Sequence, residues 1–369
     1  MIISFQVPKT CYLLDRDSRQ TVQLTVQLEN FPIESGEFAS MTPDGQRIAS
    51  HGGGFIFTYK VETGETSIIH DNDAGDRAAS QPMISANEEK VLFLSRSTNI
   101  TPHKDTNIAP DLFIHDLSTG ETDLVTVNTS GDGTGSEGAL SYALSPDGRY
   151  VAFYSLAKDH VGEGVDGNGG LDLFLRDTQE KATTLVTSKA DGTAADSSDP
   201  SALVFSAPTP SFSGDSNLLV FHSAAGNLNI NVPDTNQTFD VFLYTIDTGV
   251  TTLVSTDQAG TKAANNLAMR PKISSDGKRV VYFSRATDVG IANDTNGRYD
   301  DVFAKDLNSG TIRLLSGTPD GQGTPPTGVN TLYFTMDRKA SAVAFTTRDA
   351  IHPELKDENF QVDLFLSRQ

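Results

Sequence analysis

The chain of 369 residues is 37% hydrophobic, which is enough to bury a sizeable core in one large all-β domain or two average domains. Its 28 basic and 48 acidic residues give a formal net charge of −20 without a basic patch, which argues against nucleic acid and an anionic membrane surface as partners. The single cysteine, Cys11, excludes an intramolecular disulfide framework, and no apolar run is long enough for a transmembrane helix, so we predict no membrane insertion.

Residues 1–30 contain no basic segment followed by an apolar one, the arrangement typical of a secretory signal. Three interpretations stay open: the chain is cytoplasmic, a signal has been removed from it, or export uses another route. One cysteine fits a cytosolic protein and equally fits an exported bacterial protein that is stabilised by metal instead of disulfides.

A repeat of about 60 residues organises the chain between residues 38 and 367. Each copy begins with a first strand that ends in a Ser/Thr-x-Asp-Gly-like turn. A short apolar strand follows, then a third strand, a second turn and a fourth strand. The first turns lie at residues 42–45, 85–88, 145–148, 213–216, 274–277 and 335–338.

The segments after these turns are short continuous apolar runs, which predict strands that are buried on both faces. They lie at residues 91–94, 151–153, 218–221, 280–283 and 343–345. The third strands are expected around Phe113, Phe174, Phe242, Phe303 and Phe365, and fourth strands at residues 123–127, 184–187, 251–255 and 311–316. No stretch shows sustained helical periodicity.

This organisation predicts an all-β protein, a six-bladed β-propeller of four-stranded antiparallel blades, with seven blades as the alternative. Each unit is a small sheet that cannot bury both faces alone, whereas packing neighbouring units around an axis buries them. We therefore predict a single domain over residues 1–369. Tyr142, Arg270 and Tyr333 fall in or just before first strands, so they are expected at the central channel.

The two ends of the chain predict how the ring closes. Residues 363–366 form a third strand, and the matching fourth strand is found at residues 21–27. A last blade completed by strands from residues 1–30 would lock the ring and remove its exposed sheet edges. Residues 11–15 and 16–27 already look like a third and a fourth strand together. The blade would then carry a surplus outer strand, or the N-terminal strand pairs elsewhere.

The Ser-x-Asp-Gly turn followed by an apolar strand resembles the repeat of the TolB-like β-propellers, over residues 38–367. The resemblance implies the fold, and such propellers serve as protein-binding modules or as gating domains of serine peptidases. This chain has neither the small α/β domain that precedes the propeller in TolB nor a hydrolase domain. The loop from Asp294 to Phe303 is also similar to one in exported bacterial propellers of unassigned role.

The pattern Asp-x-Asn-x-x-x-Asp occurs five times, each time between the predicted second and third strands of a repeat. Repeat 1 lacks it and joins the two strands through residues 52–54. The five copies supply the candidate metal ligands Asp105, Asn107 and Asp111; Asp166, Asn168 and Asp172; Asp234, Asn236 and Asp240; Asp294, Asn296 and either Asp300 or Asp301; and Asp357, Asn359 and Asp363.

Carboxylate and amide oxygens, without histidine or cysteine, favour calcium over zinc, because calcium takes roughly six to eight oxygen ligands at flexible geometry. Magnesium demands tighter octahedral geometry. The competing interpretation is that these residues only cap local turns. Five copies at one phase of the repeat make several structural Ca²⁺ sites the leading hypothesis. The fifth copy, with Glu358 and Phe360, is the least suited to bind.

Residues 133–138 match Gly-x-Gly-x-x-Gly, a pattern of dinucleotide-binding loops. The pattern follows a predicted strand but opens no helix, and the chain has no βαβ unit. Nucleotide binding is therefore not expected.

Three histidines, His103, His160 and His352, lie in equivalent loops with lysines and arginines nearby in sequence. An enzyme could use such a histidine together with a cation to act on an acidic sugar. The alternative is that these histidines are exposed loop residues or support their neighbours.

These patterns favour a non-catalytic, calcium-stabilised scaffold that binds a protein or glycan at its loop-bearing face or central channel. Repetition argues against catalysis, because a catalytic carboxylate pair is normally unique within a propeller. The alternatives are an extracellular carbohydrate-active enzyme, a lyase or hydrolase with its site at the propeller axis, and a structural module of a secreted or adhesive assembly. We expect a monomer that is extracellular, at the cell surface or periplasmic.

Overall fold

The computed structural model describes residues 12–14, 21–23, 25–28, 31–34, 39–52, 54–70, 79–196, 209–228, 232, 234, 236–289, 299–317, 333–347 and 363–368. These residues form strands, turns and loops without any helix, so the expected all-β class is confirmed for them. In this described part of the chain, no helix has the length and apolar character needed to cross a bilayer.

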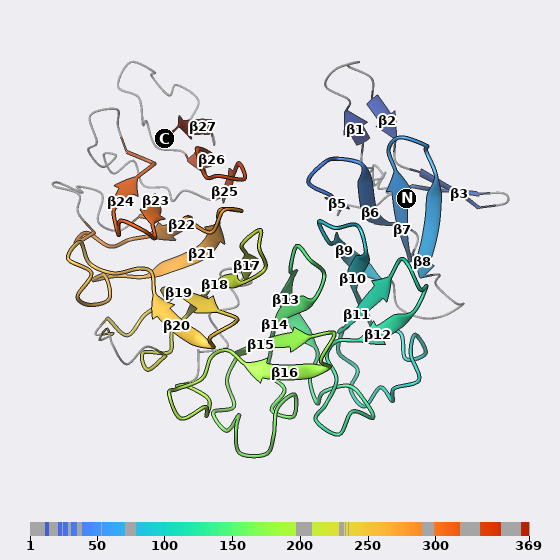
Figure 1. Ribbon diagram of the computed structural model, residues 1–369, viewed down its shortest axis with the longest axis horizontal. Coiled ribbons are helices and arrows are strands. Elements are labelled where there is room, and N and C mark those ends of the chain that lie inside the picture. The colour runs from blue at the N-terminus through green and yellow to red at the C-terminus, as the bar shows by residue number, and fades with distance from the viewer. Residues whose placement is uncertain are drawn as a thin grey trace, which may run out of the picture.

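Six antiparallel sheets follow one another along the chain and lie side by side around an arc (Figure 1). We call them blades 1 to 6. Blade 1 consists of β5 (Ala39–Met41), β6 (Arg47–Gly52), β7 (Phe55–Lys60) and β8 (Thr66–His70). Blade 2 consists of β9 (Ser80–Ile84), β10 (Lys90–Ser95), β11 (Asp111–Asp116) and β12 (Thr122–Leu124). Blade 3 consists of β13 (Ala139–Leu144), β14 (Tyr150–Ser155), β15 (Asp172–Asp177) and β16 (Ala182–Leu185).

Blades 4 and 5 repeat this order, and blade 6 has three described strands. Blade 4 consists of β17 (Ser211–Phe212), β18 (Leu218–Ser223), β19 (Asp240–Thr245) and β20 (Val250–Leu253). Blade 5 consists of β21 (Ala268–Ile273), β22 (Arg279–Ser284), β23 (Asp301–Asp306) and β24 (Ile312–Leu314). Blade 6 consists of β25 (Tyr333–Met336), β26 (Ala342–Thr347) and β27 (Asp363–Arg368).

The second and third strands of the blades carry the core, as the continuous apolar runs predicted. From blade 2 to blade 6, an aromatic ring of the second strand stacks on the phenylalanine of the third strand, with ring centroids 5.6 to 6.1 Å apart. Apolar clusters join each blade to the next along the chain. Each sheet therefore buries its faces only by packing against its neighbours. The stacked pairs are Phe93–Phe113, Phe153–Phe174, Phe221–Phe242, Tyr282–Phe303 and Phe345–Phe365.

The Ser/Thr-x-Asp-Gly turns close on themselves and also touch the next blade. In blade 3, the Ser145 hydroxyl accepts the backbone N–H of Tyr150 at 2.8 Å, and the Asp147 carboxylate accepts that of Arg149 at 3.0 Å. The Pro146 carbonyl of the same turn accepts the backbone N–H of Ala86 in blade 2 at 2.8 Å. The turn as a whole thus serves both its own hairpin and the interface between blades.

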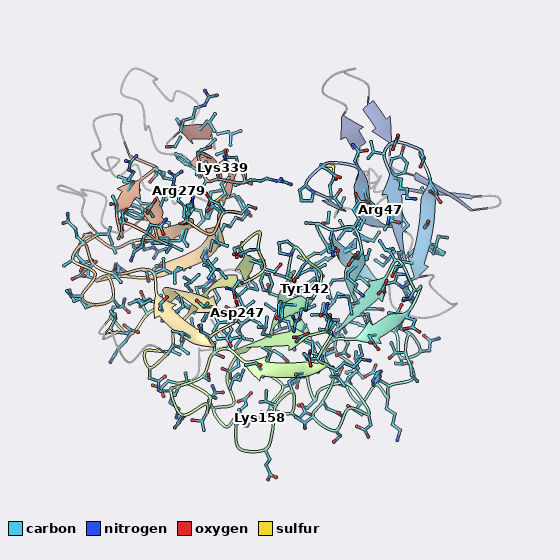
Figure 2. The ribbon with its side chains drawn as sticks, viewed as in Figure 1. Arg47, Tyr142, Lys158, Asp247, Arg279 and Lys339 are labelled. Carbon is cyan, nitrogen blue, oxygen red and sulfur yellow. The ribbon has the colours of Figure 1, made fainter. Side chains whose placement is uncertain are left out.

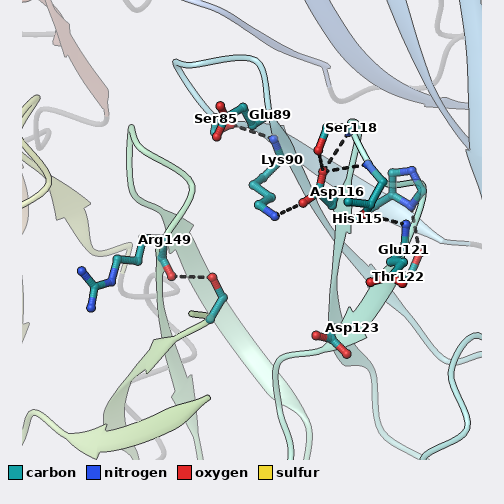
Figure 3. Close-up of polar contacts among 12 residues, drawn as sticks. Ser85, Glu89, Lys90, His115, Asp116, Ser118, Glu121, Thr122, Asp123 and Arg149 are labelled. Carbon is teal, nitrogen blue, oxygen red and sulfur yellow. Dashed lines mark hydrogen bonds and ion pairs between the residues drawn. The ribbon is translucent and has the colours of Figure 1, made fainter. Parts of the chain in front are cut away.

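A second kind of turn joins the third and fourth strands (Figure 3). In blade 2 the Asp116 carboxylate accepts the Ser118 backbone N–H at 2.8 Å and also forms an ion pair with Lys90 of the second strand. Both side chains keep some contact with solvent, at 26% and 22% exposure, so this pair contributes a small stabilisation. Its main effect is to orient the turn over the edge of the sheet.

The N-terminal strands form two separate hairpins. β1 (Tyr12–Leu14) pairs with β2 (Thr21–Gln23), and β3 (Thr25–Leu28) pairs with β4 (Phe31–Glu34). In the described part of the chain, β27 pairs with β26 alone, so the expected pairing of residues 21–27 with the last blade is not among the observed ones. The sequence interpretation of residues 11–15 and 16–27 as two adjacent strands agrees with the β1–β2 hairpin for residues 12–14 and 21–23, whereas residues 25–27 belong to β3 and pair with β4. Figure 1 shows this hairpin and blade 6 on opposite sides of the open part of the arc.

His222 on β18 generates a prediction about pH, because it is buried where the equivalent residues of blades 2, 3 and 5 are Leu94, Tyr154 and Phe283. Burial, and secondarily the charge of Arg270, lowers the pKa of His222 to about 3. The unfolded chain therefore takes up the proton first as the pH falls. Neutral His222 therefore contributes its full stability above pH ~6.5, and this contribution is lost as the pH falls toward 3. By pH 5 the free energy of unfolding has fallen by about 2 kcal/mol for this reason.

We expect the variant His222→Gln to lose less stability than the wild type between pH 7 and pH 5, measured by urea unfolding at each pH. Equal losses in the two proteins would show that His222 is not responsible.

Candidate functional site

An aspartate begins the third strand of each acidic-loop repeat and is buried in the four repeats whose side chain is described. Asp111, Asp172, Asp240 and Asp301 are all at most 2% exposed. Each lies opposite a serine of the second strand in the ladder; these serines are Ser95, Ser155, Ser223 and Ser284. The position is therefore set by the strand register and not by the loop alone.

A hydroxyl group holds each of these carboxylates. The hydroxyl belongs to the residue 15 positions later, just after the fourth strand, and it donates to the aspartate at 2.5 to 2.7 Å. The same hydroxyl accepts the backbone N–H of the residue that follows the aspartate, at 2.9 to 3.2 Å. The hydroxyl donors are Thr126, Thr187, Ser255 and Ser316. These four residues were not among those expected from the sequence, although their constant spacing from the aspartate is a usable signal.

In three repeats, burial together with the aspartate that opens the loop raises the pKa of the aspartate that begins the third strand. Burial raises the pKa of Asp111 to about 7, that of Asp172 to about 6 and that of Asp240 to about 7. The negative charge of the first loop aspartate, Asp105, Asp166 or Asp234, adds to the rise in the respective repeat. The structure thus brings together two of the three predicted ligands as pairs of repelling carboxyl groups.

The asparagine of each loop connects it to the segment after the fourth strand. The amide nitrogen of Asn107 donates to the Gly135 carbonyl at 2.7 Å, that of Asn168 to Ala195 at 2.9 Å and that of Asn236 to Ala264 at 2.7 Å. The amide oxygens accept the backbone N–H two residues later, at 2.7 to 2.9 Å. The turn-capping role that was the competing interpretation is therefore present for the asparagines.

Three carboxylate oxygens of these loops are buried without a hydrogen-bond partner among the described residues: Asp166 Oδ1, Asp172 Oδ2 and Asp234 Oδ2. Unpartnered buried oxygens in a pair of repelling acids are costly, and a cation is the group that would relieve both penalties. Over the described ranges, no group of three or more histidine, cysteine or acidic side chains is gathered around one point. Backbone carbonyls or water would have to complete a cation shell.

The fourth and fifth copies are described only in part. Asp301 occupies the position of Asp111, Asp172 and Asp240, whereas Asp300 forms an ion pair with Arg285 at 2.7 Å. Of the two candidates left open by the sequence, Asp301 is thus the structural equivalent. Asp294, Asn296, Asp357 and Asn359 lie outside the described residues, as does the side chain of Asp363, which begins β27.

The glycines of residues 133–138 are explained by packing. A Cβ on Gly135 would lie 2.3 Å from Cε1 of His160, and one on Gly138 would lie 2.0 Å from the Pro110 carbonyl oxygen. No helix follows them. These close approaches account for the pattern, in line with the expectation that it does not bind nucleotide.

Two of the three loop histidines come together. His103 and His160 line one cavity between blades 2 and 3, and His352 lies outside the described residues. His160 is only 3% exposed, so the interpretation of an exposed loop residue is wrong for it. Its ring packs edge-on against Phe153 and Phe174, both at 5.1 Å. Lys158, a cation two residues before His160, instead points outward at the outer edge of the arc (Figure 2).

The residues expected at the central channel differ in their surroundings. Tyr142 is buried, and its hydroxyl donates to the Gln81 carbonyl at 2.8 Å. Tyr333 is 71% exposed on β25, and the Arg270 guanidinium lies 5.9 Å from its ring centre. Only the second of these environments is open to a ligand.

No protein-family model matches the chain, and no curated protein matches it. Among solved structures, it is similar to dipeptidyl peptidase 4 of Porphyromonas gingivalis, with a TM-score of 0.54 and 12% identity over 91% of this chain and 44% of that one. It is also similar to the β-propeller domain of the Trilobed protease from Pyrococcus furiosus, with a TM-score of 0.48 and 12% identity over 89% and 81% of the two chains.

TolB from Acinetobacter baumannii is a third similar structure, with a TM-score of 0.41 and 16% identity over 92% of this chain and 70% of that one. At such identities the likeness concerns the fold alone. The chain spans less than half of the Porphyromonas peptidase. The fold assignment therefore rests on the six sheets themselves, which agree with a β-propeller arrangement.

The hydroxyl contacts generate the second prediction. We expect Ser255→Ala to lower the free energy of unfolding by about 1–3 kcal/mol, because a buried carboxylate and a backbone N–H both lose their partner. Ser255→Thr is the matched control and should keep most of the stability, since Thr126 and Thr187 fill this role in blades 2 and 3. Urea unfolding in the presence of a chelator measures both. An alanine variant as stable as the wild type would contradict the role of the hydroxyl.

Proposed function

We propose that the protein is a non-catalytic β-propeller scaffold that is stabilised by calcium in its acidic loops and binds a protein or a glycan. The observation that carries the calcium part is the repeated pair of neighbouring carboxyl groups, with unpartnered buried oxygens in two of the three described pairs. It recurs in loops that differ in the residues around the pattern, so it is a property of the repeat and not of one turn.

The ligands would be the two aspartates of each loop: Asp105 and Asp111, Asp166 and Asp172, Asp234 and Asp240. Calcium would neutralise the two negative charges of each pair, and it accepts backbone carbonyls and water in the rest of its shell. Equivalent residues of the fourth and fifth copies, Asp294 with Asp301 and Asp357 with Asp363, would act in the same way. The asparagines would hold the loops in shape by the hydrogen bonds described above.

The ligand of the scaffold would bind at the innermost strands. Met41 on β5, Leu140 on β13 and Tyr333 on β25 are exposed large apolar side chains at 53%, 47% and 71%. These strands line the inner side of the arc (Figure 1). Apolar side chains with an accessible aromatic ring suit either a protein segment or a sugar face. Weak calcium sites suit an extracellular, cell-surface or periplasmic location, where calcium is abundant.

We further propose that the six blades close into a ring through the two termini. The outer edge of β27 carries the exposed Leu364 and Leu366, whereas blades 1 to 5 cover the same edge with a fourth strand. An open apolar edge favours strand addition. The β1–β2 hairpin would dock on it as a unit, and its second strand would be the surplus outer one.

The calcium proposal predicts a change in thermal stability. Each site held at about ten times its dissociation constant adds about 1.4 kcal/mol, so three sites add about 4 kcal/mol. We expect the melting temperature to rise clearly when millimolar calcium replaces a chelator, measured by differential scanning calorimetry. An unchanged midpoint would overturn the proposal.

Asp172→Asn provides the matched control for this experiment. Its side-chain oxygen can still accept the Thr187 hydroxyl, while an uncharged amide replaces the unpartnered oxygen. We expect this variant to be at least as stable as the wild type in chelator and to gain less from calcium. The same gain in both proteins would show that Asp172 does not bind the ion.

Ring closure predicts that deletion of residues 1–30 lowers stability by several kcal/mol, because the edge of β27 would lose its cover. Chemical unfolding compares the full chain with the deletion variant. Equal stability would show that the N-terminal residues do not close the ring.

A further inference from the structure

A cavity of about 350 Å³ lies between blades 2 and 3, at their outer strands β12 and β16. Val125, Val127 and Val161 form its apolar part, and Arg176 on β15 and Lys181 before β16 supply positive charge. Its volume falls at the lower end of the range of small-molecule sites. The cavity is therefore large enough for one small molecule.

Arg176 is the half-buried cation of this cavity. Its guanidinium donates to the Thr183 hydroxyl at 3.1 Å, and it forms no ion pair with any residue in the described ranges. Burial lowers the pKa of Arg176 from its usual value. Two other arginines have an acidic partner: Arg149 pairs with Asp177 and Arg285 with Asp300. A half-buried guanidinium with free donors in a chain of net charge −20 is a site for an anion.

The rim of the cavity is polar. Lys181 forms an ion pair with Asp123 at 3.2 Å, and both side chains are more than half exposed. Thr129 and Thr178 add hydroxyl groups to the lining. A ligand with hydroxyl or amide groups beside its negative charge would find hydrogen-bond partners here.

At the equivalent position between blades 4 and 5, a side chain of blade 5 bonds to the outer side of blade 4. Lys305 in blade 5 occupies the position of Arg176, four residues after the aspartate that begins the third strand. Its ammonium group donates to the Val254 carbonyl at 2.7 Å and the Thr256 hydroxyl at 2.8 Å, on the outer side of blade 4. The equivalents of Val254 and Thr256 in blade 2 are Val125 and Val127, which line the cavity instead.

The remaining equivalents are also satisfied locally. Tyr244 of blade 4 is buried in the core shared with blade 3. His115 of blade 2 lies 2.9 Å from the Thr122 hydroxyl, as Figure 3 shows. Arg176 is the member of this set that faces an open cavity.

His160 is a second departure from the repeat at the same place. The matching residues of blades 2, 4 and 5 are the apolar Ile100, Leu228 and Val289. The His160 ring nitrogen Nδ1 donates to the Val127 carbonyl at 3.1 Å, and both residues line the cavity together with Arg176. Two breaks of the pseudo-symmetry thus meet in one cavity, as expected for a site that binds one ligand.

We propose that this cavity is a binding site for a small polar carboxylate, of the size of a monosaccharide or a dipeptide, whose negative charge pairs with the Arg176 guanidinium. Either a uronic acid or the end of a peptide supplies this chemistry. The site lies at the outer strands. His103 and His160 belong to the acidic-loop segments, but neither the paired loop aspartates nor the exposed inner-strand side chains line the cavity. It therefore stands independently of the scaffold and calcium proposals.

Binding to the wild-type protein is measured in calcium-containing buffer with two matched pairs of probes. D-glucuronate is compared with D-glucose, and alanyl-alanine with its C-terminal amide. We expect one carboxylate to bind at least about tenfold more tightly than its neutral partner, measured by calorimetric titration. Methyl resonances of Val125, Val127 and Val161 should shift on binding, which locates the probe in the cavity.

Variants test the role of the charge. We expect Arg176→Gln to weaken binding of the preferred carboxylate by about tenfold or more and Lys181→Gln to weaken it less. Arg313→Gln, at an exposed arginine of β24, is the matched control and should bind like the wild type. Lys181 is 66% exposed, so its variant keeps the test valid if Arg176→Gln does not fold.

Three results would overturn the inference. One is equal binding of each carboxylate and its neutral partner, and another is no saturable binding of either carboxylate. The third is wild-type affinity in both the Arg176 and the Lys181 variants. Preference for glucuronate would identify a sugar acid as the ligand class, and preference for alanyl-alanine would identify a peptide end.

Discussion

Every blade of this protein depends on the next one to bury its apolar surface. A four-stranded antiparallel sheet with aromatic rings on its second and third strands has two faces to cover, and no helix among the described residues covers them. The stacked rings of Phe153 and Phe174 and their counterparts can leave water only because a neighbouring sheet packs over them. This constraint sets the arc of blades and explains why the turns of one blade bond to the turns of the next.

The same constraint places the buried aspartates. In blades 2 to 5, the first residue of the third strand is shielded from solvent. A carboxylate there therefore needs hydrogen-bond donors that come from the chain itself. Thr187 and its equivalents supply one donor, and the loop asparagines supply others. Among the described residues, none forms an ion pair with either acid of these pairs, and Lys158 acts on Asp166 only through its charge. The acidic loops are thus bound to the core by their last residue, and any cation in them would act on the stability of the blade interfaces.

Departures from the repeat carry the information about binding that the repeat itself does not contain. Residues shared by most blades, such as the turn aspartates, explain how the fold is held. His160 and Arg176 replace residues that are apolar or locally bonded in other blades, and both line the cavity between blades 2 and 3. A ligand that has no internal repeat needs a site whose residues are not repeated. A propeller therefore binds such a ligand selectively where its blades differ.

Sequence patterns alone established the strand order, the positions of the turns and, in four of the five acidic-loop repeats, the aspartate that begins the third strand. Those features depend on local alternation, turn chemistry and a repeat that shows them several times. The sequence left open whether Asp300 or Asp301 is the repeat aspartate, and it did not reveal that His160 is buried or that Arg176 faces a cavity. Only the tertiary structure decided these points, because strand register selects Asp301 and because burial depends on a blade that is distant in sequence. Ladder pairing and packing between sheets are long-range properties, and no local pattern encodes them.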